Sequence, residues 1–227
     1  MIVVHHLNNS RSQRVLWLLE ELGADYEIKR YTRDPVTMLA PRELRAVHPL
    51  GKSPVITDGG VTVAESGAIL EYLVERYGGG TLVPPAGSPE RLRYTYWLHY
   101  AEGSAMPPLF MKLVFDRIES APLPFFVRPV ARSIARRVKR QLIEPTLRTH
   151  ADFLEGELAK SDWFAGDAFT AADVQMSFPV ESMSVRAGVT KEKYPRIGAW
   201  LDRIHAREAY ARALDKGGPF EILSGES

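Results

Sequence analysis

The sequence predicts a small mixed α/β domain over residues 1–80, a linker over residues 81–88 and an all-helical domain over residues 89–227. The stretch 77–89 marks the linker, because it has no charged side chain and seven of its thirteen residues are glycine or proline. Before this stretch, patterns typical of strands and of helices alternate. After it, nearly every apolar pattern has helical spacing, so the two parts are expected to differ in fold class.

The chain opens with a strand-helix-strand pattern. Residues 2–7 form a short apolar run rich in β-branched side chains, which predicts a buried strand. Val15, Leu18 and Leu22 then recur at helical spacing, and Gly23 follows where helices often end on a glycine. Residues 26–31 alternate in polarity and predict a second strand. A crossover of this kind makes the two strands parallel and is right-handed.

A hairpin and a helix complete the first domain. Residues 54–57 and 61–64 predict two strands joined by the turn Asp58-Gly59-Gly60. Residues 66–77 predict a helix that ends before Gly78. The predicted order is therefore βαβ followed by ββα, which suits a small mixed sheet covered by helices.

The second domain is predicted to contain only helices. Ser88 and Pro89 are suited to the N-cap and first helical positions of a helix that follows the linker. Pro107 and Pro108 should kink or restart this helix, and its continuation should end near Ser120. Apolar residues at helical spacing predict further helices over 143–158, from residue 170 onward, and over 195–204.

Composition excludes several classes of protein. The 227 residues include 29 basic and 28 acidic side chains, so no strong overall charge attracts nucleic acid or anionic lipid. The sequence has no cysteine, which excludes disulfides, thiolate metal sites and a sulfur nucleophile supplied by the protein. The first ten residues lack the basic start and long apolar run of a secretion signal, so the expected location is the cytoplasm.

The first candidate site lies between the first strand and the first helix. Asn9, Ser10 and Ser12 occupy this turn. Their side chains suit the cap of the helix. They also place hydroxyl and amide donors beside the positive end of a helix dipole, which favours a nearby anion such as a thiolate. Since the chain has no cysteine, such a sulfur would have to belong to a ligand.

Two further candidate sites flank the predicted hairpin. The Ser53-Pro54 bond enters a strand and is a place for a cis peptide, which would expose the Ser53 backbone to an incoming peptide. Lys52 beside it suits a solvated surface charge. Ser66 suits either the N-cap of the following helix or a site for a ligand carboxylate, with Glu65 facing a ligand ammonium.

Taken together, these motifs resemble the glutathione transferase (GST) superfamily over nearly the whole chain, most closely bacterial and fungal members of the type first described in yeast. The resemblance is carried by LNNSRSQRVLWLLEELG, HPLGKSPVI, AESGAILEYL and FTAADVQMSF. It implies a thioredoxin-like N-terminal domain and an all-helical C-terminal domain. Thr170 to Asp173 matches the helix-capping box of the family, with Phe169 and Val174 placed as a hydrophobic staple.

The resemblance also implies site residues. The glutathione-binding positions correspond to Ser12, Lys52, Ser53, Pro54, Glu65 and Ser66. The Ser53 backbone would pair with the cysteinyl unit of glutathione, and the Glu65-Ser66 pair would hold the γ-glutamyl end. Many classes of the family place their catalytic Ser or Cys where this chain has Asn9. Ser10 is our first candidate for the group that contacts the thiolate, because its hydroxyl can rotate onto sulfur, with Asn9 second and Ser12 third.

The expected activity is that of a detoxifying transferase. It would activate the glutathione thiol for conjugation to small hydrophobic electrophiles or for reduction of hydroperoxides, with glutathione as cosubstrate and without a metal. The alternative is a glutathione-binding module with a disulfide-reductase or protein-interaction role. A homodimer is expected, and neither a membrane nor nucleic acid is expected as a partner.

Two other groups of residues have open roles. Tyr100, Met106, Phe110 and Met111 are candidates for the cosubstrate pocket, although such apolar stripes are also typical of a core. Arg128, Arg132, Arg136 and Arg140 recur at spacing four and predict a basic stripe. This stripe suits a solvated face, or a surface that attracts anionic substrates, nucleic acid or a partner protein.

Overall fold

The computed structural model describes residues 1–34, 37, 39–218 and 220. Within these residues a four-stranded sheet has the order β2-β1-β3-β4. The strands are β1 (Ile2–Leu7), β2 (Tyr26–Tyr31), β3 (Val55–Asp58) and β4 (Val61–Ala64). Strand β1 pairs with β2 in parallel, and β3 pairs with both β1 and β4 antiparallel. The mixed sheet and the parallel crossover are as the sequence predicts.

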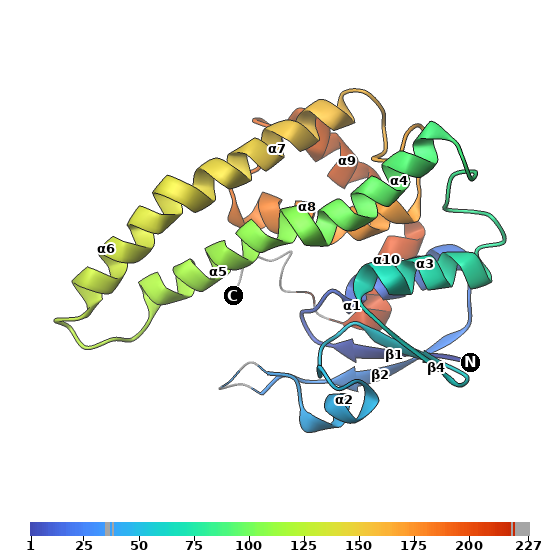
Figure 1. Cartoon of the computed structure of the whole chain (residues 1–227), viewed down its shortest axis with the longest axis horizontal. Coiled ribbons are helices and arrows are strands. Elements are labelled where there is room, and N and C mark those ends of the chain that lie inside the picture. Colours follow the sequence, from blue (N-terminus) through green and yellow to red (C-terminus); the bar gives the residue numbers. More distant parts are fainter. Residues whose placement is uncertain (35–36, 38, 219, 221–227) are drawn as a thin grey trace.

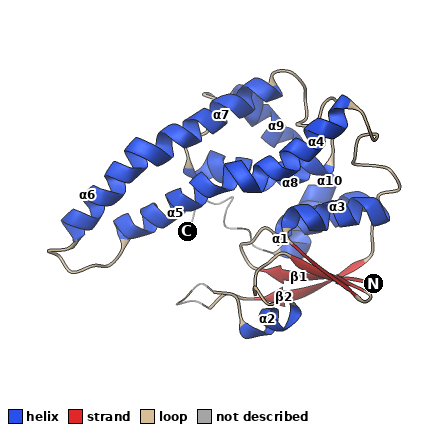
Figure 2. Ribbon diagram, viewed as in Figure 1, coloured by secondary structure: helices blue, strands red, loops and turns tan. Residues whose placement is uncertain are grey.

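Helices cover both faces of this sheet (Figures 1 and 2). Helices α1 (Ser12–Leu22) and α3 (Ser66–Tyr77) lie on one face, and the short helix α2 (Arg42–Val47) lies on the other. Gly23 ends α1 in the left-handed conformation, as expected for a C-cap glycine. The sequence patterns do not predict α2, because its six residues bury only Leu44 and make no helical stripe.

The described residues from 89 onward fold mainly into helices, as predicted. Ser88 caps the first of these helices by accepting the Arg91 N–H at 3.1 Å. Two of these helices, which have proline in their first turn, follow the preceding helix without a break, and a short π-helical segment joins each pair. The elements are α4 (Pro89–Tyr100), η1 (Ala101–Ala105), α5 (Met106–Ser120), α6 (Arg128–Val138), η2 (Lys139–Ile143), α7 (Glu144–Leu158), α8 (Ala171–Arg186), α9 (Pro195–His205) and α10 (Glu208–Gly217).

Helix α8 lies at the centre of the helical domain, and every residue from Ala171 to Met183 is buried. The predicted capping box begins it: Thr170 accepts the Ala172 N–H, and the Asp173 carboxylate accepts the Thr170 N–H. Helix α1 packs against α8 and α10, so the two domains share one hydrophobic core. In the described residues, no helix has the length and apolar character needed to cross a membrane.

Helices α5 and α6 form a hairpin that projects away from the rest of the molecule (Figure 1). The four arginines of the predicted basic stripe lie on α6 and η2 and are exposed. Part of their charge is balanced across the hairpin, since Arg136 pairs with Glu119 of α5 at 2.6 Å and Lys139 also pairs with this glutamate at 2.6 Å. The stripe is therefore exposed, and α5 balances part of its charge.

Candidate active site

A chain of buried hydroxyl groups occupies the turn between β1 and α1. Ser10 and Ser12 are both buried, and their hydroxyl oxygens lie 2.7 Å apart. The Ser10 hydroxyl also donates to Ser53 Oγ at 3.3 Å, and Ser53 Oγ donates to the His5 carbonyl at 3.0 Å. The fold thus brings together two of the three predicted clusters, which are 43 residues apart in the sequence.

The helix-capping alternative holds for this turn only in part. Arg11 occupies the N-cap position of α1, and no described side chain caps the helix there. The Ser10 hydroxyl does accept the Ser12 N–H at 3.3 Å. Asn9 is partly buried and has a left-handed backbone with φ of 50°, which asparagine tolerates better than most residues. The first N–H groups of α1 therefore have acceptors within the turn: the Ser10 hydroxyl for Ser12, and the Ser10 carbonyl for Gln13 at 3.4 Å.

The Ser53-Pro54 peptide bond is cis, as the sequence analysis predicts. Pro54 is buried at the entry to β3, and Lys52 beside it is exposed. The Ser53 side chain is partly buried and faces Ser10, so Ser53 is the member of this cluster that touches the turn before α1.

The third cluster lies at the start of α3. Glu65 is exposed and has a φ of 72°, a conformation that costs about 1–3 kcal/mol for a residue with a side chain. Glu65 occupies the N-cap position and makes no side-chain cap within the described part of the chain. Ser66 is the first residue of the helix, so the expectation that it serves as a plain N-cap is wrong. Its hydroxyl instead accepts from Arg14 Nη2 at 3.0 Å.

Arg14 joins this helix start to the helical domain. Its side chain is only 1% exposed, and Nη2 also lies 2.5 Å from Glu102 Oε1 in η1. Nη1 donates to the Gln175 carbonyl of α8 at 2.6 Å. Arg11 adds a second ion pair to Glu102 at 3.2 Å. One buried guanidinium group therefore connects α1, α3, η1 and α8.

The charges in this group shift each other's protonation. Burial lowers the pKa of Arg14, and Glu102 opposes this shift. Burial alone would raise the pKa of Glu102, but Arg14 and Arg11 outweigh it, so the pKa of Glu102 lies below its usual value. The pair is therefore charged at neutral pH.

The sequence patterns do not single out Arg14, Glu102 or Gln175 as site residues. For Arg14 a signal exists, because a charged residue directly precedes Val15 on the apolar side of α1. For Glu102 the signal is weaker: it is the acid of a short Glu-Gly-Ser segment between apolar helical residues. Nothing in the local sequence indicates that these side chains meet.

The residues predicted for the cosubstrate pocket have different environments. Tyr100 and Met106 are buried in the common core, and the Tyr100 hydroxyl lies 2.5 Å from His150 Nδ1. Phe110 is 60% exposed, and Met111 is partly buried. Phe110 and Met111 therefore offer apolar surface on α5, whereas Tyr100 and Met106 contribute to packing.

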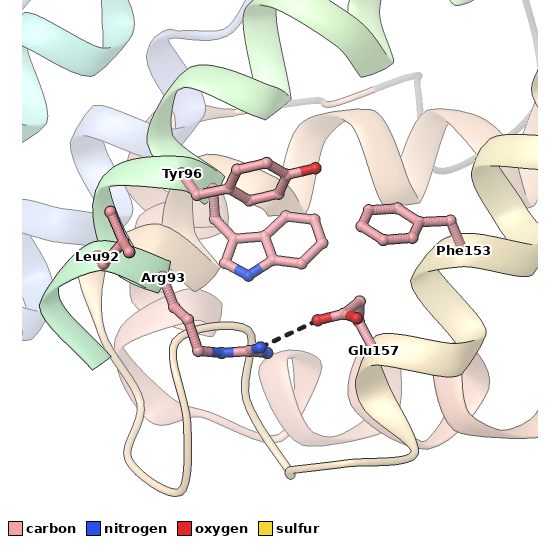
Figure 3. Close-up of a pocket in the computed structure, with 6 residues that line it drawn as sticks. Leu92, Arg93, Tyr96, Phe153 and Glu157 are labelled. Carbon is pink, nitrogen blue, oxygen red and sulfur yellow. Dashed lines mark ion pairs between the residues drawn. The ribbon is translucent and has the colours of Figure 1, made fainter. Parts of the chain in front are cut away.

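Two cavities lie outside these clusters. One, of about 270 Å³, lies between α4 and α7, where the Arg93–Glu157 ion pair runs beside the rings of Tyr96 and Phe153 (Figure 3). The other, of about 420 Å³, lies between the linker and the segment before α8, with Val83 and Phe169 among its lining residues. Neither contains a predicted site residue. Among the described residues no group of three or more His, Asp or Glu side chains is arranged to hold a metal ion.

Comparison with known proteins gives the family. The model of the glutathione S-transferase N-terminal domain matches residues 1–75, and that of the C-terminal domain matches residues 135–208. Glutathione S-transferase 3 of Schizosaccharomyces pombe is 38% identical over 95% of this chain and 88% of its own length. Glutathione S-transferase 1 of Saccharomyces cerevisiae is 33% identical over 95% of both chains.

Solved structures agree with these relatives. A glutathione S-transferase of Actinobacillus pleuropneumoniae has a TM-score of 0.76 and 31% identity, covering 98% of this chain and 95% of its own. A sphingomonad glutathione S-transferase, solved in complex with glutathione, has a TM-score of 0.72 and 25% identity, covering 95% of this chain and 98% of its own. The chain, with its thioredoxin-like domain followed by an all-helical domain, belongs to the glutathione S-transferase family.

Proposed function

We propose that this protein binds glutathione and activates its thiol for attack on small hydrophobic electrophiles. The glutathione thiol lies at the Ser10 hydroxyl, its cysteinyl backbone pairs with Ser53, and its γ-glutamyl end lies at Glu65 and Ser66. In this proposal residues 1–80 carry the glutathione site, and residues 89–227 carry the cosubstrate site.

The observation that carries the proposal is that the N-termini of helices α1 and α3 meet. Arg14 lies in the first turn of α1 and donates to Ser66, the first residue of α3. The starts of both helices therefore lie side by side. The start of α1 carries the buried Ser10 hydroxyl, which suits a thiolate. Glu65 at the start of α3 makes no side-chain cap within the described residues, so the first N–H groups of α3 favour a carboxylate.

The size of the required effect is within reach of these groups. A free thiol has a pKa of roughly 8.5, and lowering it by about two units takes ~2.7 kcal/mol of preferential stabilisation of the thiolate. One hydrogen bond to a charged group contributes ~1.5–3 kcal/mol. The start of α1 adds about 0.3–1 kcal/mol. The Ser10 hydroxyl and the helix terminus together meet the requirement.

Turnover measurements test this proposal. Rates with glutathione and either an aromatic halide or cumene hydroperoxide are compared for wild type, Ser10→Ala and Asn9→Ala. Loss of one hydrogen-bond donor to the developing charge lowers the rate about 100-fold. Ser10→Ala should therefore turn over about 100-fold more slowly than wild type. The exposed Ser120, which donates to the Asp116 carbonyl at the end of α5, provides the control Ser120→Ala. Unchanged rates in both turn variants would remove the assignment of the thiolate contact.

The same experiment separates the alternative function. Conjugation of the halide supports a transferase, and reduction of the hydroperoxide supports a glutathione-dependent peroxidase. Tight glutathione binding without either reaction favours a binding module with disulfide-reductase or interaction roles. We also propose that the protein is a homodimer, which light scattering coupled to gel filtration tests directly.

A further inference from the structure

The hydroxyl chain of the active site continues to a histidine that the proposed function leaves unused. His6 lies on β1 and is only 6% exposed. Its Nδ1 lies 2.9 Å from Ser12 Oγ, which in turn lies 2.7 Å from Ser10 Oγ. An unbroken path of two short hydrogen bonds therefore connects an imidazole to the hydroxyl that faces the proposed sulfur position.

This path can run in two directions, because a hydroxyl group both donates and accepts. With Nδ1 of His6 unprotonated, Ser12 donates to His6, and the Ser10 hydroxyl turns its proton from Ser53 Oγ to the closer Ser12 Oγ. The Ser10 oxygen then has a lone pair free for a thiol S–H. With a proton on Nδ1, each bond reverses, and the Ser10 hydroxyl points its own proton toward the sulfur.

We propose that His6 accepts the proton of the glutathione thiol through the Ser10 and Ser12 hydroxyls. The inference rests on the proposed function and deepens it. The S–H bond breaks and leaves its electron pair on sulfur, while the proton moves to Ser10 Oγ. The proton of Ser10 moves to Ser12 Oγ, and that of Ser12 moves to His6 Nδ1. Thiol and imidazole become thiolate and imidazolium, and both hydroxyl groups are restored.

The surroundings of His6 keep its imidazole neutral before the transfer. Burial lowers the pKa of His6, and Arg30, its register partner on β2, lowers it further. The backbone of Gly217 at the end of α10 opposes this shift. From α1, the Ser12 hydroxyl faces the ring. His6 is therefore neutral at neutral pH, and after the transfer it holds the proton as an imidazolium at the end of the hydroxyl path. Since it does not touch the sulfur, it is a positioning residue that acts through Ser12 and Ser10.

The neighbouring histidine provides a matched control. His5 lies on the same strand, but its side chain contacts Tyr31 at 2.9 Å and Thr57 at 3.3 Å instead of the hydroxyl chain. Because successive side chains of a strand point to opposite faces, His5 lies on the side of the sheet away from α1. A change at His5 alters a buried histidine without altering the path.

The test compares His6→Gln, Ser12→Ala and His5→Gln. For each, the ionisation of bound glutathione is followed by thiolate absorbance against pH, and kcat/KM is measured over the same range. We expect the bound thiol to titrate about one pH unit higher in His6→Gln and in Ser12→Ala, with about tenfold less thiolate below that pH. The double variant should lose no more than either single one, since both break the same path. His5→Gln should match wild type.

If the bound thiol titrated as in wild type in both His6→Gln and Ser12→Ala, and turnover were unchanged, the relay would be overturned. The proposed function would remain intact. A wild-type protein that neither binds nor turns over glutathione would overturn the proposed function itself. If a variant fails to fold, thiolate formation is timed in the wild-type protein after rapid mixing with glutathione in mixtures of light and heavy water. Several protons moving together give a curved dependence on deuterium content, and a straight line would overturn the relay.

Discussion

Arg14 of helix α1 donates to the Ser66 hydroxyl at 3.0 Å, and the same nitrogen lies 2.5 Å from Glu102 of η1. Two helix starts of the thioredoxin-like domain and a π-helical turn of the helical domain thus meet at one buried cation. A π-helical turn inserts one residue into a helix and re-aims its side chains, which is why such turns are frequent at functional sites. Here it places Glu102 against Arg14.

Arg14→Met should destabilise the protein by about 2–3 kcal/mol, because it leaves the Gln175 carbonyl without the Arg14 donor and leaves Glu102 with only the ion pair to Arg11. Chemical denaturation measures the change. Arg14→Lys keeps the charge but not the planar fork, so it should recover only part of the loss. A methionine variant within about 0.5 kcal/mol of wild type, the range of neutral surface changes, would contradict this role.

Glu102 should make stability depend on acid. Burial raises its pKa, but Arg14 and Arg11 outweigh burial and lower it. A carboxyl with a lowered pKa in the folded state stabilises the protein above the pKa of the unfolded chain and loses this contribution as pH falls through the folded pKa. Wild type should therefore lose stability relative to Glu102→Gln below about pH 4.5. Urea unfolding at pH 6 and pH 3.5 checks this, and a constant difference between the two proteins would refute it.

Ser66→Ala should weaken glutathione binding about tenfold, or ~1.4 kcal/mol, since one hydrogen bond to the γ-glutamyl carboxylate is lost. Titration calorimetry measures the affinity. Ser133→Ala on the exposed face of α6 is the control and should bind as wild type does. If Ser66→Ala bound glutathione as tightly as wild type does, the γ-glutamyl carboxylate would not lie at Ser66.

Gly78→Ala should cost about 2–4 kcal/mol, because the added Cβ would lie 2.4 Å from the Val74 carbonyl oxygen and 3.2 Å from that of Thr81. Both neighbours are backbone atoms, so they have little freedom to move. At Gly79 a Cβ would meet no atom within 4 Å, and only its φ of 54° opposes alanine. Gly79→Ala should therefore cost about 1 kcal/mol. Thermal unfolding measures the stability of both variants. Equal losses of stability in Gly78→Ala and Gly79→Ala would contradict the crowding at Gly78.

Local patterns predicted most elements because each depends on neighbours in the sequence. The alternating and helical apolar patterns predicted all four strands, α1 and α3, and Ser88 and Thr170 marked the starts of two helices of the second domain. The helices predicted from the sequence did not include α2 or α10. The six residues of α2 bury only Leu44 and make no helical stripe, whereas α10 does have Ala209, Tyr210 and Ala213 at helical spacing.

The sequence by itself determined most of the elements, the family and the three polar clusters, since these depend on residue types at short spacing. Only the tertiary structure decided which polar groups meet. It joined Ser10 to Ser53 across 43 residues and Arg14 to Gln175 across 161. It also placed Ser66 inside helix α3, where its hydroxyl accepts a hydrogen bond from Arg14. Hydrogen bonds of this kind depend on distances between elements, and a local sequence pattern holds no information about those distances.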